Sequence, residues 1–306
     1  MNNILITGGA GFIGRHLADH LASRDDTAVT VIDNESLGDR RHLDLEKVRF
    51  IHGDLASRDD LEAALEGQDA VVHLAADTRV MDSIENPQRN FDNNVIGTFN
   101  LLELSRELGV RRIVAASTGG AILGDVEPPV HEEMAPRPTS PYGASKLMLE
   151  GYLSAYSSSF GVSACALRFS NIYGPRSFHK GSVVAHFFKQ IIAGDPLVVY
   201  GDGSQTRDYL YVGDLVEAIR MAMESDVQGP YQLGSGHPTT LNQLIEVMRT
   251  VTGRDFEVEY RDFRPGEVRD TWCQVEKARA AFGYDPSTGL EEGLRATWTW
   301  FDRHGA

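Results

Sequence analysis

Short apolar runs alternate with stretches of helical periodicity through the first half of the chain. The apolar runs predict strands at residues 3–7, 28–32, 48–52, 69–74, 111–117 and 162–168, and the periodic stretches predict helices at residues 12–23, 58–66, 88–108 and 140–160. Continuous runs rich in Val and Ile are typical of strands that are buried on both faces. The pattern therefore predicts an α/β fold in which helices cover both faces of a doubly wound parallel sheet.

The predicted helix at residues 88–108 has the firmest pattern. Its apolar residues recur at helical spacing and are Phe91, Val95, Phe99, Leu102 and Leu108. Side chains at this spacing share one face of a helix. We therefore expect one continuous helix here.

The pattern changes after about residue 170. Turn-forming residues then separate shorter elements, at Gly174-Pro175, Gly194-Asp195-Pro196, Gly201-Asp202-Gly203 and Arg264-Pro265-Gly266. This change predicts a first domain over residues 1–170 and a smaller C-terminal α/β lobe over residues 171–306. Some elements of the second part are expected to return to the first domain.

A glycine-dense turn, Gly8-Gly-Ala-Gly11-Phe-Ile-Gly14, separates the first predicted strand from the first predicted helix. In this context the pyrophosphate of a dinucleotide lies on the N-terminus of the helix. Gly8 is expected to make the tight turn, Gly11 to let the backbone approach phosphate, and Gly14 to let the helix pack close to the sheet. The pattern predicts a Rossmann-type dinucleotide site; a simple helix-capping turn is the alternative.

Asp33 ends the second predicted strand, about 20 residues after Gly14. A carboxylate at this position accepts hydrogen bonds from both ribose hydroxyls of the adenosine and repels a 2′-phosphate. Asp33 therefore favours NAD over NADP as the cofactor. A surface aspartate is the alternative interpretation.

Tyr142 and Lys146 are four residues apart in the predicted helix at residues 140–160 and therefore share a face. A free tyrosine has a pKa of about 10, so roughly a thousandth of it is ionised at neutral pH. A lysine ammonium and a cationic nicotinamide nearby both favour the phenolate. The pair predicts a base for a sugar hydroxyl; a solvated helix face is the alternative.

A hydroxyl pair, Ser117-Thr118, lies at the end of the predicted strand at residues 111–117. Strand C-termini in such sheets open onto the ligand crevice. A hydroxyl there can hydrogen-bond the reacting oxygen of a substrate, and Thr118 is the first choice for this role, with Ser117 as the second. A strand-end cap is the alternative for either residue.

Composition narrows the class of protein. The 306 residues are 42% hydrophobic and carry a net charge of −15, which disfavours nucleic acid or an anionic membrane as a partner and requires a local basic site for any anionic substrate. No apolar run approaches the length of a membrane span, and the first core strand begins too early for a signal peptide. The two cysteines, Cys165 and Cys273, fit no metal-ligand spacing and indicate a reduced, cytoplasmic compartment. We expect no metal.

Together these motifs resemble the extended short-chain dehydrogenases/reductases, in particular the nucleotide-sugar epimerases typified by the UDP-galactose 4-epimerases. The resemblance covers essentially the whole chain. It rests on the glycine turn, Asp33, Gly53-Asp54-Leu55, His73-Leu74-Ala75-Ala76, Asn93-Asn94-Val95, Ser117-Thr118, Tyr142-x-x-x-Lys146, Arg168-x-x-Asn171-x-Tyr-Gly-Pro-Arg176 and Arg207-Asp-Tyr-x-Tyr-Val212. The resemblance implies NAD as the cofactor and reversible inversion at C4 of a UDP-hexose, through a transient 4-keto sugar.

The resemblance also assigns residues to the cofactor. Asp54 and Leu55 would hold the adenine, Leu74, Ala75 and Ala76 would line the cofactor backbone, and Asn94 would lie near the catalytic lysine. The implied cofactor-binding set is completed by Phe12, Ile13, Asn34, Ser117 and Phe169.

By the same resemblance, residues 1–170 are the NAD-binding domain and residues 171–306 mainly the UDP-sugar lobe. Asn171, Arg207 and Arg264 match positions that bind the diphosphate, and a surface salt bridge is the alternative for each arginine. The implied uracil wall is formed by Val184, Val198 and Tyr200. A homodimer through the helices near 88–108 and 140–160 is also implied.

Two departures from the family pattern follow the hydroxyl pair. Leu123-Gly124 stands where the family usually has Tyr-Gly, and Gly119-Gly120 adds a residue after the catalytic hydroxyl. Related 4,6-dehydratases carry an Asp-Glu pair just after the threonine to transfer protons at C5 and C6. Because glycines have no side chain for this step, the sequence disfavours dehydration.

Two residues allow more than one identity for the substrate sugar. Thr271 matches a position where some family members carry a bulkier Tyr, so a small residue there suggests room for an N-acetyl group. Arg79, in the loop after the fourth strand, could meet a C6 carboxylate, which makes UDP-glucuronate the next alternative; a structural role for Arg79 is equally open. A non-catalytic NAD-binding protein is a further alternative, although such proteins typically lose the Tyr or the Lys.

Overall fold

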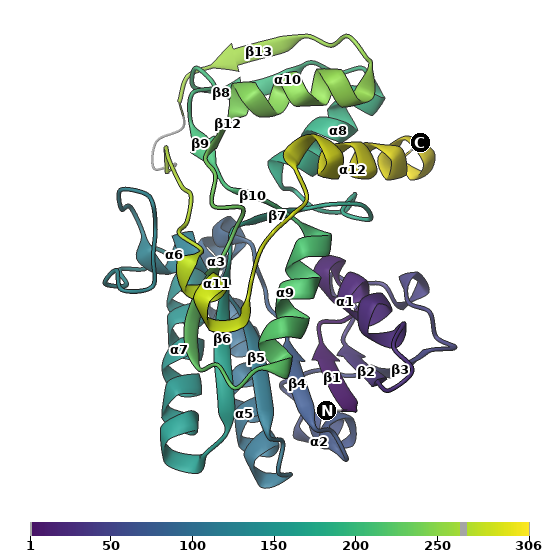
Figure 1. Cartoon of the computed structure of the whole chain (residues 1–306), viewed down its shortest axis with the longest axis vertical. Helices are drawn as coiled ribbons and strands as arrows, with labels where there is room; N and C mark the ends of the chain where they lie inside the picture. The colour runs from purple at the N-terminus through teal and green to yellow at the C-terminus, as the bar shows by residue number, and fades with distance from the viewer. Residues whose placement is uncertain (1, 264–267, 306) are drawn as a thin grey trace.

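The computed structural model describes residues 2–263 and 268–305, and its larger part is built on a parallel sheet (Figure 1). The seven strands of this sheet lie in the order β11-β6-β5-β4-β1-β2-β3, and every neighbouring pair is parallel. They are β1 (Asn3–Thr7), β2 (Ala28–Asp33), β3 (Val48–His52), β4 (Ala70–His73), β5 (Arg112–Thr118), β6 (Ser163–Phe169) and β11 (Gly229–Leu233). The predicted doubly wound sheet is confirmed, and its six predicted strands match within one residue at each end.

Helices cover both faces of the sheet because each buries an apolar stripe against it. On one face lie α2 (Arg58–Leu65), α5 (Gly97–Glu107) and α7 (Pro141–Phe160), whose buried residues include Leu61, Leu101 and Leu149. The other face is covered by α1 (Phe12–Ala22), α9 (Val212–Glu224) and α11 (Glu276–Phe282). Figure 1 shows α1 and α9 side by side, and they are in contact.

The predicted helix at residues 88–108 is confirmed, and the chain is helical without a break over residues 87–107. Its winding is not uniform: α4 (Pro87–Asn90) continues through a π-helical turn (Phe91–Ile96) into α5, and α3 (Val80–Glu85) precedes it. In the wider turn the buried Asn94 accepts a hydrogen bond from the backbone N–H of Asp77 at 2.8 Å and donates one to its carbonyl at 3.0 Å. This turn is held by contacts between Asn94 and the loop after β4, so hydrophobic periodicity alone does not detect it.

The smaller lobe has its own core, above the sheet in Figure 1. Its helices are α8 (Val183–Ala193), α10 (Leu241–Thr252) and α12 (Leu290–His304), and they bury Phe188, Met248 and Phe301 against one another. Its strands form pairs: β7 (Asn171–Tyr173) with β10 (Tyr209–Tyr211), β8 (Leu197–Tyr200) with β13 (Val258–Arg261), and β9 (Thr206–Arg207) with β12 (Thr239–Thr240).

The chain enters this lobe more than once. It leaves the sheet after β6, returns to it through α9 and β11, enters the lobe again through β12, α10 and β13, and comes back with α11 before ending in α12. Residue 170 is therefore where the chain first leaves the sheet, and the segment 171–306 contributes to both parts. None of the helices within the described ranges is both long and apolar enough to cross a membrane.

Candidate active site

The carboxyl ends of β1, β2, β4, β5 and β6 open onto a cavity of about 700 Å³, which the segment 179–182 before α8 borders from the smaller lobe. Most of the predicted cofactor and catalytic residues line it. They are Gly8, Gly11, Phe12, Ile13, Gly14, Asp33, Asn34, Asp54, Leu55, Leu74, Ala75, Ala76, Ser117, Thr118, Tyr142, Lys146 and Phe169, and Asn171 from the predicted substrate set joins them.

The glycine turn between β1 and α1 is tight and closely packed. Gly8 has a φ of 68°, and a Cβ atom there would lie 2.7 Å from Cα of Ala75. A Cβ atom on Gly14 would lie 2.4 Å from the carbonyl oxygen of Gly8. Gly11 begins α1 without a side-chain cap, so no side chain satisfies the first N–H groups of this helix. These features fit the pyrophosphate of a dinucleotide, which binds such N–H groups.

Asp33 holds the turn in place from the end of β2. Its Oδ2 accepts a hydrogen bond from the backbone N–H of Ala10 at 3.0 Å, and its Oδ1 accepts one from Glu35 at 2.8 Å. Burial raises the pKa of this carboxyl. Next to it, Asn34 donates to Oδ2 of Asp54 at 2.8 Å, which joins the ends of two strands at the predicted adenosine site. The residues on this side of the cavity therefore fit NAD.

Tyr142 and Lys146 both reach the cavity from the first turns of α7. Ser140 caps this helix by accepting a hydrogen bond from Gly143 at 3.1 Å, and Pro141 occupies its first turn. The Lys146 ammonium donates to the carbonyl of Ala116 at 2.9 Å. Burial lowers the pKa of Lys146 to about 8, against a smaller opposing effect from the Glu150 carboxylate.

The expected lowering of the Tyr142 pKa is not produced by the protein groups alone. Burial raises the pKa of this phenol to about 12. Desolvation disfavours the charged form of a buried phenol and is the cause of this increase.

The two hydroxyls at the end of β5 have different surroundings. The buried Ser117 donates to Oε1 of Glu150 at 2.7 Å. Thr118 lies just before α6 (Gly119–Leu123), makes no side-chain cap to it, and lines the cavity. The geometry therefore favours Thr118 as the hydroxyl available to a ligand.

Asn94 lies behind the cavity wall. Besides Asp77, it contacts Ser145, to whose Oγ it donates at 3.1 Å. Ser145 directly precedes Lys146, so Asn94 links the loop after β4 to the start of α7. Asn94 thus bonds to the residue next to Lys146, and it is absent from the described cavity lining.

Of the remaining predicted substrate residues, those that the structure describes also lie outside that lining. Arg207 donates to the backbone carbonyls of Val268 and Arg269 at 2.8 Å, while Val184 is buried in the core of the smaller lobe. Val198 and Tyr200 are partly buried on β8. Thr271 lies over the glycine pair: its Cγ2 would be 3.7 Å from a Cβ atom on Gly120. Arg264 lies outside the described residues.

Sequence reasoning missed a basic segment at the cavity. His179 and Lys180 line it opposite Arg79, and burial and the Arg79 charge lower the pKa of Lys180. The Arg79 side chain is 60% exposed and lies 3.7 Å from Asp82. The signal that could have found this segment is the need for a local cation in an acidic protein. Asp77, Thr78 and Ser182 are further lining residues to which the sequence assigns no role, and Asn93 lines the cavity as part of the Asn93-Asn94-Val95 motif.

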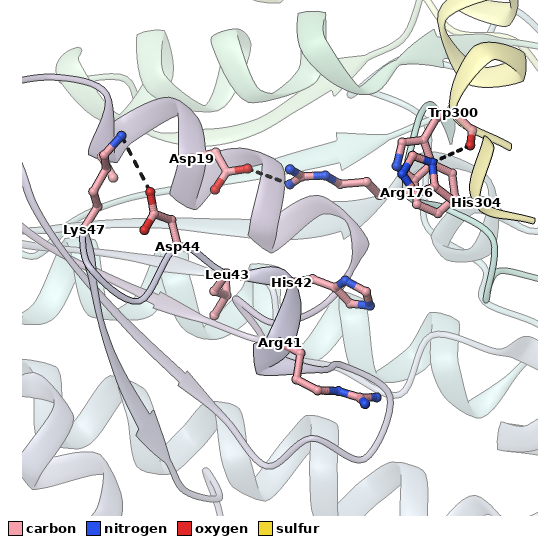
Figure 2. A pocket seen from close by; sticks show the side chains of 10 residues that line it. Asp19, Arg41, His42, Leu43, Asp44, Lys47, Arg176, Trp300 and His304 are labelled. Atoms are coloured by element: carbon pink, nitrogen blue, oxygen red, sulfur yellow. Dashed lines mark hydrogen bonds and ion pairs between the residues drawn. The ribbon is translucent and has the colours of Figure 1, made fainter.

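A second pocket, of about 710 Å³, lies between α1, the segment 41–47 and α12. Figure 2 shows Arg176 pointing toward Asp19 and Lys47 toward Asp44, with which they form ion pairs. None of the predicted catalytic residues lines this pocket. Within the part of the chain that the structure describes, no group of three or more His, Cys, Asp or Glu side chains could hold a metal ion.

The parallel sheet, the glycine turn and Asp33 define a dinucleotide-binding protein of the doubly wound class. A family model for the NAD dependent epimerase/dehydratase family matches residues 4–234. The chain belongs to this family.

Solved structures and relatives of known sequence match this chain over nearly its full length. UDP-glucose 4-epimerase from Thermotoga maritima, solved with UDP-glucose, is 37% identical with a TM-score of 0.94, covering 99% of this chain and 100% of that one. UDP-glucose 4-epimerase from Thermus thermophilus, solved with NAD, is 38% identical with a TM-score of 0.92 and the same coverage. UDP-glucuronate 4-epimerase from Thermodesulfobacterium geofontis is 33% identical over 98% of this chain and 96% of its own length.

Proposed function

We propose that this chain is an NAD-dependent UDP-hexose 4-epimerase, an isomerase that inverts C4 through a transient 4-keto sugar. The observation that carries the proposal is a single cavity that Tyr142, Lys146 and Thr118 share with the glycine turn and Asp33. A base, a cation and a hydroxyl thus line the same cavity as the residues that fit a dinucleotide. Relatives whose names include UDP-sugar 4-epimerases support the reaction.

In this proposal each catalytic side chain has one task. Tyr142 takes the proton of the 4-hydroxyl as a phenolate and returns it to the product. Lys146 holds a positive charge beside the phenol and anchors the nicotinamide ribose. Thr118 donates a hydrogen bond that orients the reacting oxygen. Bound NAD supplies the oxidation and the reduction at C4.

Inversion requires the sugar to turn over while the rest of the substrate stays bound. Binding energy must therefore come from the non-reacting diphosphate and uracil. We assign the diphosphate to Asn171, Arg207 and Arg264, and the uracil to Val184, Val198 and Tyr200. The hydrogen bonds of Arg207 to backbone carbonyls support a fixed guanidinium, which suits an anchor.

The test is incubation of the purified protein, without added cofactor, with UDP-glucose, UDP-galactose, UDP-N-acetylglucosamine or UDP-glucuronate, followed by chromatography of the nucleotide sugars. The C4 epimer of at least one substrate is expected, and Tyr142→Phe should abolish it while NAD still copurifies. No epimer from any substrate, with and without added NAD, would contradict the proposal and favour a non-catalytic NAD-binding protein.

A uronate is the second candidate substrate, and the basic side chains at the cavity favour it. Arg79 and Lys180 reach the cavity from different parts of the fold, and a C6 carboxylate would pair with them. Lys180→Ala and Arg79→Ala should then lower kcat/KM for UDP-glucuronate more than for UDP-glucose. Lys277→Ala is the matched control, because its ammonium binds the carbonyl of Pro230 away from the cavity. Equal losses on both sugars would refute this assignment.

An N-acetylhexosamine is a third candidate, supported by the small side chain of Thr271 near Gly120. Thr271→Tyr should then reduce turnover of UDP-N-acetylglucosamine and leave that of UDP-glucose nearly unchanged. The same loss for both sugars would remove Thr271 as a determinant.

We also propose a homodimer through the exposed side of α5 and α7. Phe99 and Tyr152 are 39% and 40% exposed there and make an edge-to-face contact at 5.8 Å. Phe99→Glu should lower the mass measured by light scattering to that of a monomer. Leu45→Glu, at a residue 53% exposed outside these helices, is the control.

The free thiols of Cys165 and Cys273 suit the cytoplasm, where we place the protein.

A further inference from the structure

A buried ion pair lies directly behind the catalytic side chains. Arg168 on β6 donates through Nε and Nη2 to the two oxygens of Glu150, at 2.8 Å and 2.7 Å. The two side chains are only 3% and 9% exposed. Glu150 also accepts the hydrogen bond from Ser117 at 2.7 Å. The reaction proposed above gives this pair no role, although its carboxylate belongs to the same helix as Tyr142 and Lys146.

Helix α7 places Glu150 one turn after Lys146. Tyr142, Lys146 and Glu150 follow one another at intervals of four residues and therefore share a face of the helix. The ammonium itself donates to the carbonyl of Ala116, and among the described residues no carboxylate lies within ion-pair distance of it. Glu150 is the anion that acts on it, from one helical turn away.

The other groups that face Lys146 do not supply a negative charge. His73, from β4, is fully buried between Thr7 and Thr98, and burial lowers the pKa of its imidazole to about 3, so it is neutral. Tyr142 on α7 is neutral in the protein alone, because its pKa is raised to about 12. Arg168 is positive but is bound to Glu150. A buried ammonium in such surroundings tends to lose its proton.

We propose that Glu150 is a positioning residue for the epimerase reaction: its carboxylate, fixed by Arg168 and Ser117, keeps the Lys146 ammonium charged and holds the end of β5 beside Thr118. Arg168 acts through Glu150, because its two hydrogen bonds fix the direction of the carboxylate. Because it assigns a task within that reaction, this inference rests on the proposed function.

The test compares three variants of Glu150 and its partner. Glu150→Gln removes the charge and keeps the shape, while Glu150→Asp keeps the charge. Glu150→Gln/Arg168→Met removes both charges, so that no guanidinium is left buried without its carboxylate. Circular dichroism and NAD content establish that each variant is folded and loaded.

The first readout is the pKa of Lys146 in the NAD-loaded protein, from carbon-13 NMR of lysine labelled at Cε. The signals are few, because the sequence contains only Lys47, Lys146, Lys180, Lys189 and Lys277, and Lys146→Met identifies the relevant one. Loss of an anion near an ammonium makes deprotonation easier, so Glu150→Gln should lower this pKa by about one unit. The double variant should lower it by less, because it also removes the positive charge of Arg168. Glu150→Asp should leave it near the wild-type value.

The second readout is the pH profile of epimerisation. Lys146 acts in its protonated form, so a lower pKa removes activity at a lower pH. The ratio of the Glu150→Gln rate to the wild-type rate should be near one in mildly acidic buffer. It should fall about tenfold as the pH rises above the pKa of Lys146. An equal loss at every pH, or an unchanged Lys146 titration, would overturn the proposal. If the wild-type protein epimerises no sugar, the proposed function fails, and the NMR titration still decides whether Glu150 charges Lys146.

Discussion

Tyr142 lies where burial raises the pKa of its phenol to about 12, which is far from the value that a base needs at neutral pH. At pH 7 only about one molecule in 10⁵ would then carry a phenolate. Half-ionisation at that pH requires the pKa to fall by about 5, which corresponds to about 7 kcal/mol of preferential stabilisation of the charged form. Burial alone accounts for the raised pKa, and we expect the positive charge of a bound nicotinamide to supply most of this stabilisation.

The expected result is therefore a pKa of Tyr142 that depends on the charge of the cofactor. The phenolate can be followed by its near-ultraviolet absorbance, as the difference between wild type and Tyr142→Phe over a pH titration. In the NAD⁺ complex the difference should titrate near neutral pH, and in the NADH complex, whose nicotinamide is uncharged, several units higher. Lys146→Met should raise it further in both complexes.

Turnover provides the second arm of this test. Tyr142→Phe should lower kcat by about 10²- to 10⁴-fold, the usual contribution of a general base, with NAD content unchanged. A phenolate that appears only above pH 10 in the NAD⁺ complex, or a Tyr142→Phe variant with near-normal turnover, would refute the assignment of Tyr142 as the base.

Three further predictions concern the fold and the anchor. His73 has a pKa of about 3 in the folded state, below its unfolded value of about 6.5, so its contribution to the free energy of unfolding should fall by about 1.4 kcal/mol for each pH unit below 6.5. His73→Gln should remove this part of the pH dependence, as measured by urea unfolding at a series of pH values. An unchanged pH dependence would contradict the prediction. Gly14→Ala should destabilise the protein by about 1–3 kcal/mol, because its Cβ would lie 2.4 Å from a carbonyl oxygen. The control is Gly151→Ala, whose Cβ would meet nothing within 4 Å and which should stabilise the protein by up to about 1 kcal/mol in the same measurement. Equal effects of the two variants would argue against the close contact at Gly14. Arg207→Ala should weaken UDP-sugar binding more than about tenfold in calorimetry with NAD content unchanged, as expected for loss of a charged hydrogen bond; unchanged affinity would remove it from the anchor.

The cofactor half of the site could be predicted from the sequence because its geometry follows from local rules. A glycine with positive φ at Gly8, a close approach at Gly14 and a carboxylate at the end of β2 each have a residue type that the backbone requires. The strands were predictable for the same reason, since their apolar runs are buried on both faces. The π-helical turn at residues 91–96 was not predictable, because it depends on the hydrogen bonds of Asn94 to a distant loop.

The substrate side could not be predicted as well, because it is formed by loops that meet only in the folded chain. Lys180 belongs to no sequence motif, and only the folded chain brings it to the same cavity as Arg79. The distinction between Ser117 and Thr118 likewise depends on Glu150, which is far away in sequence and reaches Ser117 from α7. Pairings of this kind depend on tertiary contacts and not on local periodicity.

In the proposed reaction, the residues that carry out the chemistry are separate from those that select the sugar. Thr118, Tyr142 and Lys146 are held by the regular elements β5 and α7, whose register is fixed by buried strands and a capped helix. The groups that could distinguish a neutral sugar from an acidic one, Arg79 and Lys180, belong to connecting segments that can vary without disturbing the sheet. Substitutions in these segments should therefore change the relative kcat/KM for different UDP-sugars without changing the pH dependence that Tyr142 and Lys146 impose on each of them.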